Sequence, residues 1–472
     1  MLFNSIDFLF VFLPITFFVY FALNKLKLVK MATAWLVIAS LTFYSYWKID
    51  YLPLILISMI FNYSIGSTLA SENNLRINKK LVMLFAIGAN VCLLGYYKYF
   101  DFLIQNINAL FHSNFNYMHI MLPLAISFFT FQQIAYIVDS YNGKTKEYDF
   151  LTYSLFVTFF PQLIAGPIVH HSEMMPQFDR LRNRFINHKN ISIGLFLLAI
   201  GLFKKVMIAD FFSVFAIGAF DKFPVLTCFE AWCASISYTF QLYFDFSGYC
   251  DMAMGIGYLF NIVLPQNFNS PYKANSIQDF WRRWHITLSR FLKDYIYIPL
   301  GGNRCGTFNT YKNLFLTFLI GGIWHGANWT FVIWGALHGI ASCVYRVWKN
   351  FNIKIPNFLA IFMTFIFCNF AWIYFRASSF DKANQIIASM FGLNGFAPLV
   401  IDKLRFSFEG GDLKLSLFLI IPAFIIVFCV PNSLEIVNKF KNDWKFFVST
   451  LVLLLISTLY IYKVSEFLYF QF

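Results

Sequence analysis

The amino-acid sequence predicts an all-α polytopic membrane protein. Of its 472 residues 59% are hydrophobic and 12% charged, against roughly 45–50% and about 25% in soluble domains. The mean hydropathy is +0.62, and 63 Phe, 26 Tyr and 11 Trp suit surfaces that face lipid. Apolar stretches close to the ~20 residues that cross a bilayer recur along the chain. We expect about ten full spans plus two partial ones.

The first four apolar stretches cover residues 8–23, 31–47, 52–68 and 81–97. Cations follow the first and the third of them: Lys25, Lys27 and Lys30, then Arg76, Lys79 and Lys80. Because cytoplasmic loops are rich in Lys and Arg, both loops are expected in the cytoplasm and the N-terminus outside. No basic residue precedes the first stretch and no small-x-small cleavage site follows it, so we interpret it as a retained span rather than a signal peptide.

Residues 151–169 are apolar but are not expected to cross the membrane. A crossing would place the cations of residues 180–189 outside, against the same rule. Pro161, Gly166 and Pro167 also interrupt a helix there. We therefore predict a re-entrant segment. A cavity is expected beside it, because broken backbone at membrane depth must be covered by protein or water.

Six further full spans complete the expected fold, at residues 121–138, 191–220, 226–243, 356–375, 415–430 and 446–462. Lys439, Lys441 and Lys445 precede the last one, which places the C-terminus outside as well. The chain has no linker, low-complexity tract or internal repeat, so we predict a single domain over residues 1–472.

The net charge of +13 reflects 36 Lys and Arg against 23 Asp and Glu. Cytoplasmic loops account for this excess better than a nucleic-acid partner does, so no nucleic acid is expected. The eight cysteines show no C-x-x-C spacing and fall mostly in apolar stretches. Neither disulfides nor a metal site is expected.

Residues 245–310 are the least membrane-like part of the chain. The run Trp281-Arg-Arg-Trp-His285 alternates cations with aromatic rings, and Lys293 follows. Guanidinium groups bind phosphates in bidentate fashion while indoles bury apolar area, so Arg282, Arg283 and Lys293 are candidates for binding a phosphate-rich ligand or lipid headgroups. The alternative is an ordinary interfacial belt of Trp and Arg.

His325 is the candidate catalytic residue. The 13 residues from Lys312 to Trp324 span about 20 Å as a helix, short of the ~30 Å membrane core, so His325 is expected part-way through the membrane. Asn328 follows at i+3 and could orient the imidazole or support a developing oxyanion. The alternative is a histidine hydrogen-bonded to a neighbouring helix, and His338 fits that role better.

A neutral imidazole at this depth suits acyl transfer, because it can accept a proton from an attacking hydroxyl and return it to the leaving group. Hydrolysis by a Ser-His-Asp triad fits less well, since the chain has no G-x-S-x-G sequence. The phosphate-binding G-x-x-x-x-G-K-[ST] sequence is also absent.

Three strings resemble the membrane-bound O-acyltransferases: Gly322-Ile-Trp-His325-Gly-Ala-Asn-Trp, Trp281-Arg-Arg-Trp-His285 and Tyr243-Phe-Asp-Phe-Ser-Gly-Tyr. The resemblance covers nearly the whole chain. It is strongest to the bacterial cell-envelope branch, which holds the proteins of alginate O-acetylation, peptidoglycan O-acetylation and teichoic acid D-alanylation.

The resemblance implies a central funnel or channel, with His325 as the catalytic histidine and His285 as the second histidine on the cytoplasmic side. It also implies that an acyl thioester, acetyl-CoA or an acyl-carrier thioester, is the donor, with no bound cofactor. The expected partner is an extracytoplasmic SGNH-type O-acetyltransferase, and the expected location is the bacterial inner membrane, among its lipids.

The C-terminal residues 467–472 read Phe-Leu-Tyr-Phe-Gln-Phe. They fit F-x-Y-x-x-F, which resembles the terminal motif of the partner peptide in teichoic acid D-alanylation. Tyr469 is therefore a candidate acyl relay, while the alternative is an aromatic interfacial belt.

Together these features predict an acetyl relay for an envelope polysaccharide, with peptidoglycan favoured over alginate. Two other classes stay open at this stage. A transporter or flippase for an envelope precursor would use His325 as a gate or proton relay. A structural scaffold would tolerate changes at every candidate site residue.

Overall fold

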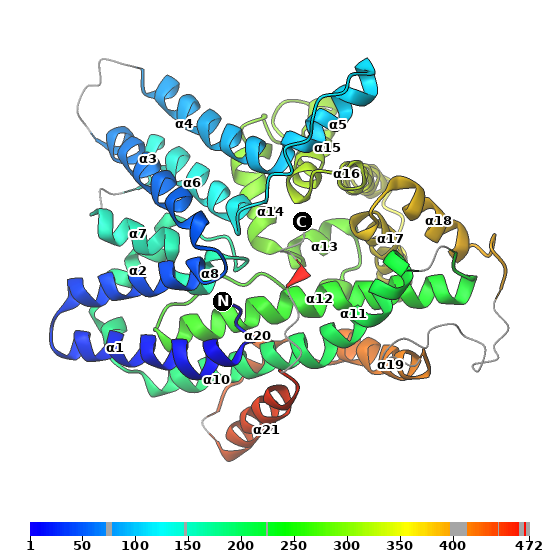
Figure 1. The fold of residues 1–472 in the computed structure, drawn as a ribbon. Coiled ribbons are helices and arrows are strands. Elements are labelled where there is room, and N and C mark those ends of the chain that lie inside the picture. Colours follow the sequence, from blue (N-terminus) through cyan, green and yellow to red (C-terminus); the bar gives the residue numbers. More distant parts are fainter. Residues whose placement is uncertain are drawn as a thin grey trace. The chain divides into compact units, whose positions relative to one another are not determined.

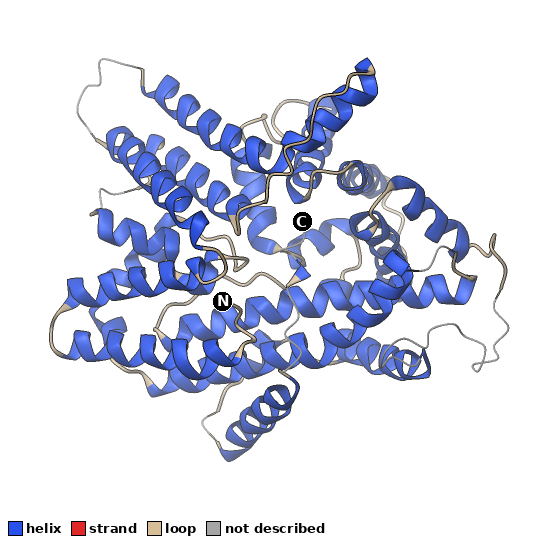
Figure 2. Cartoon of the chain, in the orientation of Figure 1, coloured by secondary structure: helices blue, strands red, loops and turns tan. Residues whose placement is uncertain are grey.

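The computed structural model describes residues 1–71, 78–145, 149–222, 225–396, 413–441, 443–461 and 467–468. Within these ranges the chain is helical, with loops between helices and no strand (Figure 2). The all-α prediction is therefore confirmed for the described chain. Arg76, expected in a cytoplasmic loop, and Tyr469, the candidate acyl relay, lie outside the described residues.

The chain divides into two compact units, and each is described by itself. The first contains Met1–Ile200, Tyr249–Pro265 and Lys441–Glu466. Its helices are α1 (Leu13–Lys25), α2 (Val29–Ser45), α3 (Leu52–Ala70), α4 (Lys79–Leu94), α5 (Phe100–Phe111), α6 (Ile126–Tyr141), α7 (Phe150–Thr158), α8 (Phe160–Leu163), α9 (His171–Asp179), most of α10 (His188–Phe203) and α21 (Trp444–Tyr460). A single domain over residues 1–472 stays our prediction.

The second unit contains Gly201–Gly248, Gln266–Phe440 and Phe467–Phe472. Its helices are α11 (Asp210–Ile217), most of α12 (Cys228–Leu259), α13 (Ile277–Arg283), α14 (Ile286–Leu292), α15 (Thr307–His325), α16 (Trp329–Asn350), α17 (Asn357–Arg376), α18 (Phe380–Met390), α19 (Leu413–Cys429) and α20 (Ser433–Asn438). Short 3-10 or π-helical turns join several helices of both units: η1 (Asp7–Phe12), η2 (Ile49–Tyr51), η3 (Gly95–Tyr99), η4 (Leu181–Arg184), η5 (Lys204–Ala209), η6 (Gly218–Lys222), η7 (Pro271–Lys273) and η8 (Lys293–Tyr297).

Six helical stretches of the described chain are long and apolar enough to cross a membrane: Asp7–Lys25, Ile49–Ala70, Lys79–Phe111, His188–Lys222, Trp329–Asn350 and Asn357–Arg376. Five of them coincide with predicted spans. Three shorter apolar helices, Val29–Ser45, Phe418–Cys429 and Trp444–Tyr460, overlap three further predicted spans. A multi-pass membrane protein is supported, whereas the predicted count of ten is not confirmed.

The stretch around His325 turns within the chain, at the glycine-rich sequence that surrounds this histidine. The chain there forms two helices, α15 and α16, which turn at Gly326 and Asn328. Helix α16 continues well past Gly339 to Asn350, and its 22 residues are enough to cross a bilayer. Gly326 ends α15, whereas Gly335 and Gly339 lie inside α16 and permit close packing against α15.

The predicted break in residues 151–169 is confirmed. In the first unit α7 ends at Thr158, and α8 restarts with Pro161 in its first turn. The carbonyl oxygen of Phe156 accepts hydrogen bonds from the side-chain amides of Gln132 (2.9 Å) and Gln162 (2.7 Å). The two side-chain amides thus provide hydrogen bonds to a buried carbonyl group that has no partner within the broken helix. A cavity of about 10 Å³, room for about one water, lies beside the break.

Candidate functional site

His325 is the last residue of α15 and lies in a nest of aromatic rings. Its imidazole is 4% exposed. The ring centroids of Trp324, Trp334 and Phe375 lie 4.9, 5.0 and 5.1 Å from that of His325. Helix α16 supplies Trp334 and α17 supplies Phe375, so side chains of three helices contact this ring. Figure 1 shows the backbone of α15, α16 and α17.

Close packing of α15 on α16 holds His325 in place. A Cβ atom at Gly322, one turn before His325, would lie 2.5 Å from the carbonyl oxygen of Phe331 and 2.8 Å from the Cα of Gly335. A Cβ at Gly335 would in turn lie 2.6 Å from the carbonyl oxygen of Phe318. Only glycine permits this approach, which is typical of helix pairs in membranes.

Asn328 begins α16 as its N-cap residue. Its side-chain oxygen accepts the N–H of Thr330 at 3.1 Å, and its amide nitrogen donates to the carbonyl oxygen of Ser378 at 3.0 Å. The structure thus gives Asn328 a capping role, and its side chain also ties the start of α16 to the loop between α17 and α18. The predicted role in orienting His325 or supporting an oxyanion stays a prediction.

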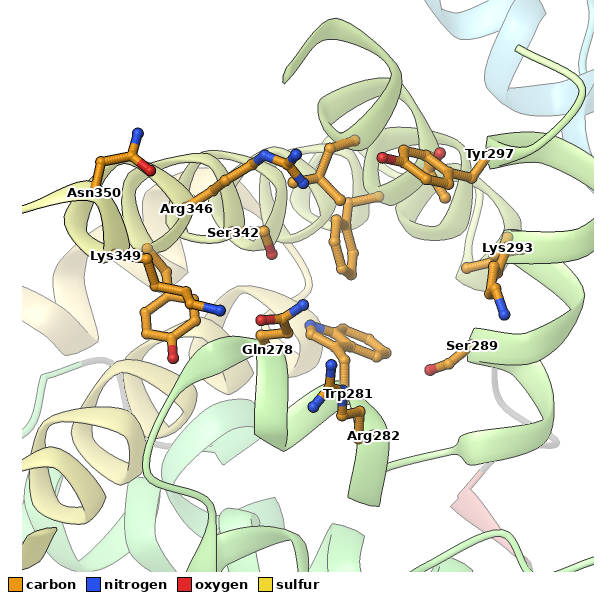
Figure 3. Close-up of a pocket in the computed structure, with 15 residues that line it drawn as sticks. Gln278, Trp281, Arg282, Ser289, Lys293, Tyr297, Ser342, Arg346, Lys349 and Asn350 are labelled. Carbon is orange, nitrogen blue, oxygen red and sulfur yellow. The ribbon is translucent and has the colours of Figure 1, made fainter. Parts of the chain in front are cut away.

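A cavity of about 700 Å³ lies in the second unit, lined by residues of α13, α14, η8, α15 and α16 (Figure 3). Its volume lies within the usual range for small-molecule sites. Four cations line it: Arg282, Lys293, Arg346 and Lys349. Figure 3 shows Arg346 and Lys349 along α16, Lys293 across from them and Trp281 between. No acidic residue is among the described lining, so the cavity is suited to an anionic ligand.

Two of the three predicted ligand-binding cations, Arg282 and Lys293, therefore line one cavity. The third, Arg283, is not brought there. Its guanidinium pairs with the Asp279 carboxylate one turn earlier at 2.9 Å and reaches the carbonyl oxygen of Asn269 at 3.4 Å. Neighbouring residues on a helix point in different directions, which separates Arg283 from Arg282. A ligand-binding role for Arg283 stays a prediction.

Arg346 and Lys349 were missed as site residues. Cations at the end of an apolar stretch are ordinarily taken to mark a cytoplasmic loop. They share one face of α16 with Ser342 and Tyr345, at the i, i+3, i+4 and i+7 spacing of a helix face, and this face lines the cavity. The spacing was visible in the sequence. What this face of α16 packs toward was not visible, because the rest of the cavity is lined by α13, α14, η8 and α15, which lie earlier in the chain.

His325 is not among the residues that line this cavity, and Trp281 lies between the two. Its indole lines the cavity and its ring centroid lies 5.8 Å from that of Trp334, which contacts His325. The indole N–H of Trp281 donates to Nδ1 of His338 at 3.2 Å. His338 is fully buried, so the alternative offered for it, a histidine packed between helices, is what the structure contains. Two ring contacts thus separate the cationic cavity from His325.

His285 lies between α13 and α14 with φ of +43°, a left-handed conformation that is uncommon outside glycine. It is fully buried. Its Nδ1 lies 3.1 Å from Oδ1 of Asn267, which also accepts from the N–H and hydroxyl of Thr287. Because that oxygen is an acceptor, Nδ1 carries the proton and Nε2 is the basic nitrogen. Burial lowers the pKa of His285 to about 3, so the ring is neutral at pH 7.

His325 and His285 both belong to the second unit, as do the cavity cations. His285 is joined to the aromatic cluster through its neighbour Trp284, whose ring centroid lies 4.8 Å from that of Trp372. Trp372 stacks on Trp334 at 5.7 Å, and Trp334 contacts His325. This arrangement places a cavity lined by four cations two ring contacts from an imidazole, and such a cavity is suited to a phosphate-rich ligand.

Comparison with known proteins decides the family. The profile of the membrane-bound O-acyltransferase family matches residues 140–380. A peptidoglycan O-acetyltransferase of Helicobacter pylori is 47% identical to the chain, over 100% of this chain and 98% of that protein. This chain belongs to the membrane-bound O-acyltransferase family. It is accordingly an O-acyltransferase, as the sequence predicts.

Two further relatives resemble the chain over shorter stretches. A probable alginate O-acetylase of Pseudomonas putida is 40% identical over 83% of this chain and 80% of its own length. A teichoic acid D-alanyltransferase of Bacillus subtilis is 28% identical over 54% of this chain and 69% of its own length. The predicted resemblance to the cell-envelope branch is therefore confirmed. Within the described residues, no group of three or more His, Cys, Asp or Glu could hold a metal ion.

Proposed function

We propose that this O-acyltransferase moves an acetyl group from a cytoplasmic thioester to the outer side of the bacterial inner membrane, for O-acetylation of peptidoglycan. The observation that carries the proposal is the cavity with four cations and no described acidic lining, two ring contacts from His325. The 47% identity to a peptidoglycan O-acetyltransferase over the full chain favours that polymer over an alginate-like one.

The donor we propose is acetyl-CoA, which brings several phosphates. Arg282, Lys293, Arg346 and Lys349 supply the charge to bind them, and the Trp281 indole offers an apolar face to the rest of the donor. An acyl-carrier protein would present one phosphate on a flexible arm and would leave part of this charge unused. The cavity therefore supports coenzyme A over a carrier protein.

The chemical step is acyl transfer at His325. An attacking hydroxyl gives its proton to the imidazole as its oxygen bonds to the thioester carbonyl carbon. The C–S bond then breaks, and the imidazolium returns the proton to the departing thiolate. Because His325 is only 4% exposed, the Trp281 and Trp334 rings must shift for the carbonyl to reach it. His285, neutral and held by Asn267, is proposed as the second histidine of the site.

The acceptor hydroxyl we propose is that of Tyr469, with the C-terminus outside. A tyrosyl ester is a better acyl donor than an alkyl ester, since phenol has a pKa near 10. An SGNH-type O-acetyltransferase on the outer side would then take the acetyl group to the polymer. The N-terminus is proposed outside as well.

The test is acetyl-CoA consumption by the purified full chain in micelles, followed by chromatographic measurement of free coenzyme A. His325→Ala should abolish consumption while the protein still inserts and accumulates. The matched control is His188→Ala, which changes an exposed histidine at the start of α10 and should leave the rate unchanged. If the wild-type protein leaves the thioester intact, the transporter alternative gains and the acyltransfer proposal fails.

A further inference from the structure

The described end of the chain is buried in the second unit. Phe467 is 2% exposed and Leu468 is 7% exposed. The backbone N–H of Leu468 donates to the side-chain oxygen Oδ2 of Asp245 at 2.9 Å, across 223 positions of sequence. Segments near a chain end are ordinarily exposed unless contacts hold them. Here both an apolar and a polar contact hold it.

Asp245 lies in α12 and is itself 1% exposed. Its other oxygen, Oδ1, lies 2.7 Å from the Nζ of Lys205, which also pairs with Asp210 at 2.9 Å. A buried carboxylate is costly unless a cation and hydrogen-bond donors compensate it. Lys205 is shared between two carboxylates, and the terminal segment supplies the donor to Oδ2. One carboxylate oxygen of Asp245, Oδ2, thus accepts from the backbone of Leu468, while the other, Oδ1, pairs with Lys205.

Phe467 supplies the apolar contact. Its ring centroid lies 5.7 Å from that of Phe246, the residue after Asp245. Phe246 packs edge-on against His285 with centroids 4.8 Å apart. Two adjacent residues of α12 therefore hold two adjacent residues of the C-terminal segment. The contact lies one ring away from a histidine that the sequence analysis placed in the site.

We propose that Asp245, held by Lys205, and Phe246 form a docking site for the chain's own C-terminal segment, residues 467–472, of which Phe467 and Leu468 are described. Asp245 is a positioning residue in this proposal, since it binds the backbone of Leu468. The proposal rests on the acyl relay of the proposed function, because Tyr469 directly follows Leu468 in the sequence. Its ligand class is a peptide that begins with an aromatic residue and offers a backbone N–H at the next position.

The alternative is that the Lys205–Asp245 pair serves only to stabilise the fold. Asp210 provides the matched control, because it pairs with the same lysine and has no described hydrogen bond to the C-terminal segment. A purely structural role would make loss of Asp210 and loss of Asp245 act alike on the segment. Docking would make only the loss of Asp245 release it.

The experiment measures labelling of Leu468→Cys in the full chain by a water-soluble maleimide, read by peptide-resolved mass spectrometry. The bonded group is a backbone N–H, so the cysteine keeps the hydrogen bond. Labelling should be slow in this background and rise about tenfold or more with Asp245→Ala, as expected for a lost hydrogen bond to a charged group. Asp245→Asn should fall between the two because its oxygen still accepts. Asp210→Asn should change the rate less than about twofold, within the range of a partly exposed pair.

Equal labelling of the Asp245→Ala and Asp210→Asn proteins would overturn the docking proposal. If Asp245→Ala does not accumulate, Phe467→Ala tests the same site from the segment side, and unchanged labelling there would overturn it too. Acetyl-CoA consumption and polymer acetylation are measured on the same preparations. Release of the segment without any loss of polymer acetylation removes the relay and leaves docking in place. If His325→Ala abolishes activity but Leu468→Cys is labelled at the same rate in every variant, the acyltransferase function stands and the docking proposal fails.

Discussion

Replacing Gly322 by alanine should displace His325 and reduce acyl transfer strongly. The added Cβ would lie 2.5 Å from the carbonyl oxygen of Phe331, whereas ordinary contact begins at 3.4 Å. Backbone atoms cannot rotate away, so α15 and α16 must separate by about 0.9 Å, the difference between these distances. His325 lies one turn further along α15. A misplacement of about 1 Å commonly costs about 100-fold in rate, and overpacking of this kind costs about 1–3 kcal/mol of stability.

The neighbouring glycine is the control. A Cβ at Gly321 would meet only the Cδ1 atom of Leu292, at 3.1 Å, and that atom is the end of a flexible side chain. Gly321→Ala should therefore keep most of the activity, while Gly322→Ala loses about two orders of magnitude. The assay is acetyl-CoA turnover in micelles, with thermal unfolding of each variant measured alongside. Equal activities of the two variants would refute the argument that glycine contact on α16 positions His325.

Three further predictions follow from the cavity, the N-cap and the buried histidine. The double change Arg346→Gln and Lys349→Gln should raise KM for acetyl-CoA about 10- to 100-fold, because each lost charge-assisted contact is worth roughly 1.5–3 kcal/mol before the discount for solvent. The control is Arg283→Gln, which should leave KM near wild type because an ion pair holds Arg283 away from the cavity. A rise of KM in this control would contradict the assignment of the cavity cations. Asn328→Ala should lower the free energy of unfolding by about 1 kcal/mol because the helix cap is lost, whereas Asn328→Ser should keep both this free energy and the turnover near wild type. A serine variant that is stable but inactive would show that the Asn328 amide acts in the chemistry. The pKa of His285 is about 3 in the folded protein and about 6.5 in the unfolded chain, so the protein takes up a proton on unfolding at any pH between these values. The melting temperature should therefore fall as the pH drops below about 6.5. An equally steep fall in the His285→Gln protein would assign that pH dependence to other groups.

Much of the helical architecture was predictable because a membrane span leaves a strong local signal. The stretch predicted at residues 52–68 is Ile49–Ala70, and that predicted at 356–375 is Asn357–Arg376. Helix α12 was harder. It continues to Leu259, well beyond the predicted end at Tyr243, through a segment that contains Asp245. The charge looked unfit for a buried helix because its compensating cation, Lys205, lies 40 positions earlier in the chain.

The site was predictable only in part. The spacing and composition around His325 and Trp281 sufficed to single out both, because a histidine between glycines and a run of alternating cations and indoles are unusual in apolar sequence. They could not reveal that Arg346 and Lys349 face the same cavity as Arg282, or that Arg283 turns to Asp279. Side-chain direction depends on which helices pack together, and that choice involves contacts far apart in the chain.

The sequence by itself determined the class of protein: a helical membrane enzyme with a buried imidazole and an excess of cations. Those properties depend on local composition and on motifs of a few residues. Tertiary structure decided which cations share a cavity, how closely α15 approaches α16, and that the backbone N–H of Leu468 bonds to the carboxylate of Asp245. These outcomes depend on burial and charge compensation between distant residues, for which no local pattern exists.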